Sequence, residues 1–172
     1  MASIRPNVFT VECIAQTKPV KVTDIDLDIE KNAGRVEYLD FIEKDVVFKD
    51  VSEAEIIISG GYGMGCAENF KLLHELAIKT GAAVGASRKA VDEGWVPFEI
   101  QIGQTGKTVA PDLYIACGIS GALQHSIGIK NAKKIVAINN DPTAPIFSMS
   151  DVAIVGDVKQ VLIKLNEMVS QK

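Results

Sequence analysis

Residues 111–125, with the sequence PDLYIACGISGALQH, decide the fold class of this chain. The apolar run at 113–117 has the length of a buried strand, and the glycines at 118 and 121 predict a turn after it. Ser120 stands where the N-cap of a following helix would lie. A strand that passes through a glycine turn into a helix directs backbone N–H groups at one point, where anions such as phosphates bind. We therefore predict a ligand site here, with three side chains able to hydrogen-bond the ligand: Ser120, Gln124 and His125.

The same order of strand and helix continues on either side of this segment. Apolar runs predict strands at residues 54–59, 82–86, 113–117, 133–139 and 152–155. Helices are predicted at residues 67–80 and 88–93, from Gly121 and after Asp157, and a short extended piece at 144–146. This alternation predicts an α/β fold, Rossmann-like, with a parallel sheet covered by helices on both faces. Ligands of such sheets bind outside the carboxyl ends of the strands, where this chain has glycines and small polar residues.

Residues 1–50 have a different pattern and are predicted to form a small β-rich lead-in segment. Strands are expected at 8–14, 21–29 and 36–43, and the turn at 32–34 makes the last two a candidate hairpin. We place the domain boundary at residue 50, so that residues 51–172 form the ligand-binding domain. Because the lead-in does not look like the start of an α/β unit, we expect this chain to be a fragment of a longer protein.

The composition excludes several classes of protein. The chain has 172 residues, enough for one domain with a sizeable core, and its net charge of −4 argues against nucleic acid as the main partner. No apolar run approaches the roughly 20 residues of a membrane span, and the first residues lack the apolar core of a signal peptide. We therefore expect a cytoplasmic protein, or the mature form of an organellar one, without membrane insertion. The three cysteines, Cys13, Cys66 and Cys117, are far apart and are expected to be free thiols.

Two glycine-rich segments have more than one interpretation. Residues 60–65 (GGYGMG) follow a strand, but they miss the dinucleotide fingerprint because position 66 is cysteine. This turn either binds phosphate or contains glycines for steric reasons alone. Residues 104–107 (QTGK) lack the complete phosphate-loop pattern, and a loop that lines a cofactor fits better, because Gly103 and Gly106 allow close backbone approach.

Three further side chains also have a structural alternative beside the functional one. Arg88 is either a surface helix residue or a fixed positive charge for an anionic ligand. His125 is either a packed side chain or a ligand contact, and Asp157 is either a helix N-cap or a contact to ribose or adenine. His74 and Trp95 are interpreted as structural. No hydrolase is predicted, since the sequence around Ser120, GISG, lacks the GxSxG elbow.

Five longer motifs together resemble one family. They are residues 85–88 (GASR), 103–107 (GQTGK), 110–114 (APDLY), 118–125 (GISGALQH) and 138–147 (INNDPTAPIF). They are similar to the C-terminal FAD-binding domain of the electron transfer flavoprotein alpha subunit, over at least residues 56–169. The resemblance implies a deoxyhypusine-synthase-like NAD/FAD-binding fold, bound FAD, and an electron transfer flavoprotein beta subunit as partner. It further implies an electron carrier, not an enzyme, that exchanges electrons with flavoprotein dehydrogenases.

The resemblance also assigns roles to residues. Arg88 would lie near the isoalloxazine and favour its reduced, anionic states. Thr105 would hydrogen-bond near flavin N5, and His125 would face the N1–C2=O edge. The pyrophosphate and ribityl chain would lie along residues 120–124, and Asn139 and Asp157 would hold the AMP end. The complete set of expected cofactor contacts is Tyr62, Ser87, Arg88, Ile102, Gly103, Gln104, Thr105, Ser120, Gly121, Ala122, Leu123, Gln124, His125, Asn139, Asp157 and Val158.

Two positions depart from the family pattern. The family usually has arginine in the first glycine turn, where this chain has Tyr62, and lysine before Asp-Pro, where this chain has Asn140. Each departure removes a positive charge near the expected cofactor. Two alternatives therefore remain open: an NAD-binding enzyme domain of the same fold, and an interaction module without cofactor.

Overall fold

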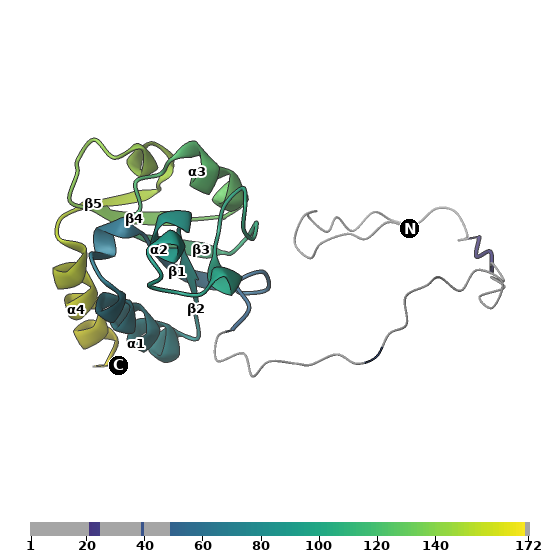
Figure 1. Cartoon of the computed structure of the whole chain (residues 1–172), viewed down its shortest axis with the longest axis horizontal. Coiled ribbons are helices and arrows are strands. Elements are labelled where there is room, and N and C mark those ends of the chain that lie inside the picture. The colour runs from purple at the N-terminus through teal and green to yellow at the C-terminus, as the bar shows by residue number, and fades with distance from the viewer. Residues whose placement is uncertain (1–20, 25–38, 40–48, 171–172) are drawn as a thin grey trace. The chain divides into compact units, whose positions relative to one another are not determined.

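The computed structural model describes residues 21–24, 39 and 49–170. Its centre is a five-stranded sheet in which all strands are parallel, in the order β2-β1-β3-β4-β5 (Figure 1). The strands are β1 Ile56–Gly60, β2 Ala83–Ala86, β3 Leu113–Cys117, β4 Ile135–Asn139 and β5 Val152–Val155. The predicted Rossmann-like α/β class is confirmed, and β3 and β5 have the predicted bounds.

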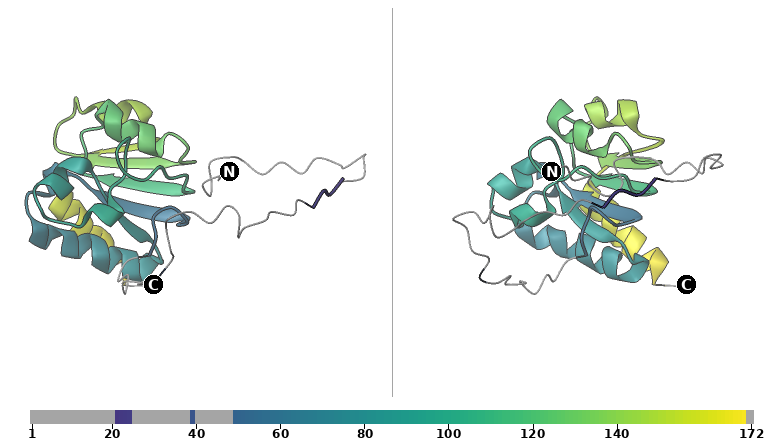
Figure 2. Two further views of the ribbon diagram at one scale, coloured as in Figure 1. Left: turned by 45° about the vertical axis from the view of Figure 1, so that its right-hand side comes forward. Right: turned by 90° about the vertical axis from the view of Figure 1, so that its right-hand side faces the viewer.

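Helices cover both faces of the sheet, as predicted (Figure 2). They are α1 Phe70–Thr80, α2 Arg88–Asp92, α3 Leu123–Ile129 and α4 Val158–Val169. Alternate side chains of the strands point to opposite faces. Ile58 and Cys117 pack with α1 and α4 on one face, and Ile57 and Tyr114 pack toward α3 on the other.

The sequence explains where the two longest helices begin and end. The spacing of apolar residues in α1, Phe70 and Leu73 among them, predicts one apolar helix face, and that face is buried against the sheet. Gly81 ends that helix in the left-handed conformation, with φ of 69°, which costs glycine little. The carboxylate of Asp157 accepts a hydrogen bond of 2.9 Å from the backbone N–H of Gln160, so the predicted N-cap of α4 is confirmed.

The region after β3 differs from the prediction at two points. The helix begins at Leu123, not at Gly121, and Ala122 takes the N-cap position, so Ser120 is not the cap. Residues 144–146 are not extended, because Pro145–Met149 forms a 3-10 helix with proline in its first turn. Ile146 accounts for both differences. Its N–H donates to the Ser120 carbonyl, and Gly121, with φ of 84°, packs directly against it.

Most of the predicted lead-in lies outside the described residues. Residues 21–24 and 39 belong to two of its predicted strands, and they form neither strand nor helix. The remaining predictions for residues 1–48, including the hairpin, are not covered by the structure. Cys66 and Cys117 are free thiols, as expected, and Cys13 is outside the described range. Among the described residues, no helix combines the length and apolar character that crossing a bilayer requires.

Candidate functional site

A cleft of about 670 Å³ opens at the carboxyl ends of the strands. It is bordered by the segments that follow β1, β2, β3 and β4, and so lies where the strand order reverses between β1 and β3. Open parallel sheets bind their ligands at this point, and cofactor sites typically have volumes of roughly 300–1,000 Å³. The lining residues are Tyr62, Gly63, Ser87, Arg88, Lys89, Asp92, Gly118, Ile119, Ser120, Ala122, Gln124, His125, Asn139, Asp141, Ala144 and Pro145.

Two glycine turns meet backbone to backbone beside this cleft. The N–H of Gly63 donates to the carbonyl of Gly118 over 2.9 Å, and a Cβ atom on Gly61 would overlap that same carbonyl. Gly118 has φ of 63°, and a Cβ there would lie 2.7 Å from the Gly63 carbonyl carbon. The structure therefore supports the steric explanation for the glycines of the 60–65 turn. Phosphate binding by that turn stays a prediction, with Gly63 in the cleft lining.

The wall formed by α2 brings two cations to the cleft. Arg88 and Lys89 are the first residues of α2, and Ser87 between β2 and α2 occupies the N-cap position without a side-chain hydrogen bond to the helix. Arg88 Nε lies 3.5 Å from Asp92, and Lys89 Nζ lies 3.1 Å from Glu93. The hydrogen bond that Lys89 donates to Glu93 raises the pKa of Lys89, which therefore stays charged. Both cations are exposed, and screened surface pairs of this kind release their cations to a better anion at little cost.

Tyr62 replaces the family's arginine but has a cation beside it. Its ring stacks on Trp95, with centroids 5.6 Å apart and planes 7° from parallel. The ammonium group of Lys89 lies 5.3 Å from the centroid of the Tyr62 ring. Phe70 meets Trp95 edge-on at 6.4 Å, so Trp95 has the structural role expected of it and also supports the cleft wall. A positive charge thus lies beside Tyr62, carried by α2.

His125 lies on α3 with both ring nitrogens bonded inside the protein. Nδ1 lies 3.0 Å from the carbonyl oxygen of Ile102, and Nε2 lies 2.9 Å from the hydroxyl of Tyr114. The side chain is 7% exposed, and burial lowers the pKa of the imidazole to about 4. His125 is therefore both packed and part of the cleft lining. Its role toward a flavin stays a prediction, and the ring is uncharged at neutral pH.

The loop of residues 102–107 borders the first turn of α3. The N–H of Gln104 donates to the Gln124 carbonyl over 2.7 Å, and a Cβ on Gly103 would lie 2.8 Å from that oxygen. Close approach to the backbone of α3 thus explains Gly103, and its expected place beside a cofactor stays a prediction. Gln104 and Thr105 are exposed and do not line the cleft described above.

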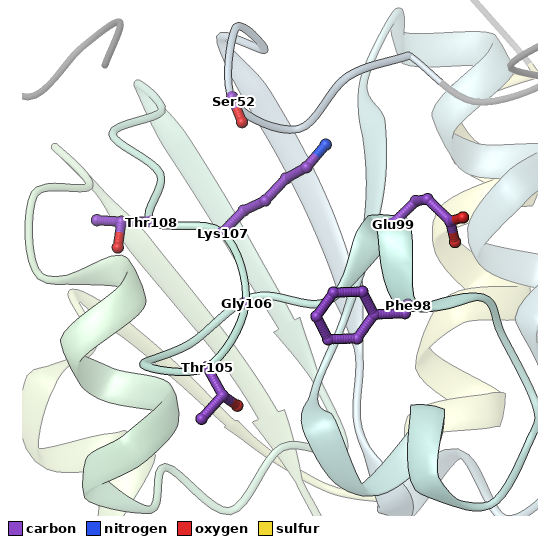
Figure 3. A pocket seen from close by; sticks show the side chains of 7 residues that line it. All are labelled: Ser52, Phe98, Glu99, Thr105, Gly106, Lys107 and Thr108. Atoms are coloured by element: carbon purple, nitrogen blue, oxygen red, sulfur yellow. The ribbon is translucent and has the colours of Figure 1, made fainter. Parts of the chain in front are cut away.

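Thr105 instead borders a second cavity of about 330 Å³ (Figure 3). Phe98 and Lys107 stand on two sides of this hollow, and the Lys107 ammonium bonds Asp50 at 2.9 Å. The amide of Gln101 donates to the Thr105 hydroxyl over 3.0 Å. The expected position of Thr105 at flavin N5 stays a prediction.

The ends of β4 and β5 supply the residues expected at the AMP end. Asn139 lines the cleft, and its amide donates to the Ile119 carbonyl while its oxygen accepts from the Asp141 N–H, both over 3.0 Å. Asp157 does not line the cleft and serves as the cap of α4. Its contact with an adenosine group stays a prediction.

The structure therefore divides the predicted contacts into two groups. Those that line the cleft are Tyr62, Ser87, Arg88, Ser120, Ala122, Gln124, His125 and Asn139. Those outside its lining are Ile102, Gly103, Gln104, Thr105, Gly121, Leu123, Asp157 and Val158. Lys89 and Asp141 line the cleft without having been predicted. Asp141 lies two residues after the predicted contact Asn139, at the same strand end, and Lys89 lies one residue after Arg88, so the position of the strand ends was the signal that could have identified both.

Comparison with known proteins identifies close relatives. The family model described as the electron transfer flavoprotein FAD-binding domain matches residues 50–130. The mitochondrial electron transfer flavoprotein subunit alpha of Oryza sativa subsp. indica is 45% identical, over 100% of this chain and 49% of the relative. Protein FixB of Clostridium saccharobutylicum is 49% identical, over 96% of this chain and 49% of the relative. The chain thus spans about half the length of these curated relatives.

A third relative matches a shorter region more strongly. The mitochondrial electron transfer flavoprotein subunit alpha of Dictyostelium discoideum is 56% identical, over 71% of this chain and 34% of the relative. Among solved structures, a putative thiamin diphosphate-dependent enzyme from Mycobacterium smegmatis has a TM-score of 0.45 and 19% identity, over 69% of this chain and 25% of that one.

Proposed function

Since the chain belongs to the electron transfer flavoprotein alpha-subunit family, we propose that it binds FAD in the cleft and carries electrons. The bound flavin supplies the redox chemistry, by accepting and releasing electrons. The observation that carries the proposal is the position of the cleft at the reversal of strand order, where family-pattern residues from four strand ends come together.

The chemistry of the cleft fits a dinucleotide. A pyrophosphate carries negative charge, and Arg88 and Lys89 both border the cleft on one wall. The ribityl and ribose hydroxyls need polar partners, which Ser87, Ser120 and Asn139 offer. Tyr62 on its Trp95 support offers an aromatic surface for a planar ring. These groups hold and orient the cofactor, and Arg88 and Lys89 offer it positive charge on one wall of a cleft that Asp92 and Asp141 also line.

The remaining contacts are carried over from the family pattern. Arg88 and Thr105 are proposed at the isoalloxazine, with Gly103 and Gln104 beside the ring. His125 faces the N1–C2=O edge as an uncharged ring, so its effect there is that of a dipole. Asn139 and Asp157 are proposed at the AMP end. This assignment requires the cofactor to extend beyond the cleft toward the loop of residues 102–107 and toward the end of β5.

The partners are proposed on the same basis. We expect a beta subunit to complete the protein, and flavoprotein dehydrogenases to deliver or receive the electrons. The chain then acts as a carrier and turns over no substrate of its own. Relatives from rice are named mitochondrial, and for this chain we propose the cytoplasm or the interior of an organelle.

A binding titration tests the proposal. Trp95 is the single tryptophan of the chain and stacks on Tyr62, which lines the cleft, so its fluorescence reports on ligand binding there. We expect FAD to quench this emission and to remain bound through gel filtration in the presence of the beta subunit. NAD is expected to have no effect at equal concentration. Quenching by NAD but not by FAD would identify an NAD-binding domain, and a folded chain that binds neither would refute the proposal.

Matched lysine variants test the charge assignment. Lys89→Gln is expected to weaken FAD binding about tenfold, which corresponds to the ~1.4 kcal/mol of one lost charge-assisted contact. Lys159→Gln removes a lysine from the exposed first turn of α4, outside the cleft lining, and should leave affinity unchanged. If both variants bind FAD with the affinity of the wild type, Lys89 is not part of the proposed site. A similar loss in both would indicate a general effect of net charge.

A further inference from the structure

Two buried hydrogen bonds join β3, α3 and the loop of residues 102–107. Tyr114 on β3 is fully buried, and its hydroxyl oxygen lies 2.9 Å from His125 Nε2 on α3. The other ring nitrogen, Nδ1, lies 3.0 Å from the carbonyl oxygen of Ile102, at the start of the 102–107 loop. The imidazole thus bridges the centre of the sheet and a loop that borders the proposed cofactor site.

The chemistry of the two partners fixes the direction of each hydrogen bond. A backbone carbonyl can only accept, so Nδ1 must carry the proton. In a neutral ring Nε2 is then an acceptor, and the Tyr114 hydroxyl must donate to it. Burial favours this neutral form, since it lowers the pKa of His125. The Nε2-protonated tautomer would leave Nδ1 facing the Ile102 oxygen with two acceptors opposed.

The same region is held by backbone contacts that leave little room. Gln104 N–H donates to the Gln124 carbonyl over 2.7 Å, one residue before His125. A Cβ on Gly128 would lie 2.6 Å from the Cα of Gly103. A displacement of the imidazole would therefore move the loop relative to α3. Of these residues, Tyr114 is the one that lies on β3, the central strand of the sheet.

We propose that Tyr114 is a positioning residue of the cleft, whose hydroxyl fixes His125 as the Nδ1-protonated neutral ring and holds the 102–105 loop against α3. The positioning role does not depend on the proposed function. Its consequence for the flavin rests on that function, because the residues held in place are those proposed to contact the flavin. His125 then presents the cofactor with an uncharged ring of fixed orientation. The tautomer itself is a property of the chain without any ligand.

Histidine NMR tests this assignment directly. The chain has two histidines, so a sample labelled with 15N-histidine gives two sets of ring signals, and His74→Gln assigns them. At pH 7.5 we expect His125 to be in the Nδ1-protonated form with slow exchange of that proton. A His125 ring that is Nε2-protonated or charged at this pH would overturn the proposal. The tautomer is read on the unmodified chain, and a variant serves only to assign the signals, so the result does not depend on whether Tyr114→Phe folds.

Two variants then separate positioning from packing. Tyr114→Phe keeps the buried ring and removes the hydroxyl, and we expect His125 to lose its single tautomer and the Gln104 amide to exchange at least tenfold faster. Thr80→Val is the matched control, because it removes a hydroxyl that bonds the Leu76 carbonyl over 2.7 Å at the end of α1, on the opposite face of the sheet. It should change neither signal. An unchanged tautomer and exchange rate in Tyr114→Phe would overturn the proposal.

The outcome for FAD is measured separately in the same samples. If Tyr114→Phe changes the tautomer and the wild-type chain binds no FAD, the positioning role stands and the proposed function fails. If FAD binds the wild-type chain and Tyr114→Phe changes neither the tautomer nor the visible spectrum of the flavin, the positioning role fails alone. If Tyr114→Phe changes both the His125 tautomer and the visible spectrum of the bound flavin, the positioning role and the proposed function are both supported.

Discussion

Mild acid is expected to destabilise this protein through His125. The ring is neutral and buried in the folded state, where its pKa is about 4, while an unfolded histidine has a pKa near 6.5. Between these two values the unfolded chain binds a proton that the folded chain does not. The free energy of unfolding therefore falls as the pH decreases from about 6.5 toward 4. For one such group, the expected loss between pH 7.5 and pH 5.5 is about 1.4 kcal/mol.

Urea unfolding at the two pH values measures this loss. The window ends at pH 5.5 because most carboxylates titrate below it, in both the folded and the unfolded chain. His125→Gln removes the titrating group, and its free energy of unfolding should change by about 1.4 kcal/mol less than that of the wild type over the window. His74→Gln is the comparison variant. Burial also lowers the pKa of His74, so the removal of this histidine should reduce the pH dependence of the unfolding free energy in the same direction.

Two results would refute this reasoning. The first is an equal pH dependence in the wild type and in His125→Gln, because the protonation of His125 would then be the same in the folded and unfolded chains. The second is an NMR titration that places the pKa of His125 at or above 6.5 in the folded chain. Either result would mean that the ring nitrogens reach water, and that the buried bonds to Tyr114 and Ile102 are not maintained.

Three further predictions concern backbone strain, helix capping and thiol reactivity. Gly118→Ala should cost more than ~2 kcal/mol of unfolding free energy, while Gly94→Ala should cost only ~1 kcal/mol, because both have positive φ but a Cβ meets the opposite turn only at Gly118. Equal losses by urea unfolding would argue against the close contact of the two turns. Asp157→Ala should lose ~1 kcal/mol from the missing cap of α4 and bind FAD more weakly, and unchanged FAD affinity would leave Asp157 as a cap only. In a chain that carries Cys13→Ser, Cys66 should react with a thiol reagent well before Cys117, because burial raises the pKa of Cys117 to about 12. Faster labelling of Cys117 would show that β3 opens at its end.

Much of the fold could be predicted from the sequence because its signals are local. The apolar run at Leu113–Cys117 and the apolar face of α1 each depend on spacing within one element, and both are found as predicted. The position of the cleft followed from the rule that parallel strands end at one edge of a sheet. Ser120 was placed wrongly as a helix cap, because the start of α3 depends on Ile146, which approaches from a distant part of the chain.

The sequence by itself determined the fold class, the glycine turns after the strands and the family to which the chain belongs, since each is written in spacing and motif. Only the tertiary structure decided that Lys89 stands beside Tyr62, and that Tyr114 and Ile102 take both nitrogens of His125. These contacts depend on strand register and on how α2 and α3 pack on the sheet, and a sequence pattern does not encode them locally. In the segment of residues 111–125, the sequence identified the histidine, and the packing of the sheet made it a neutral ring.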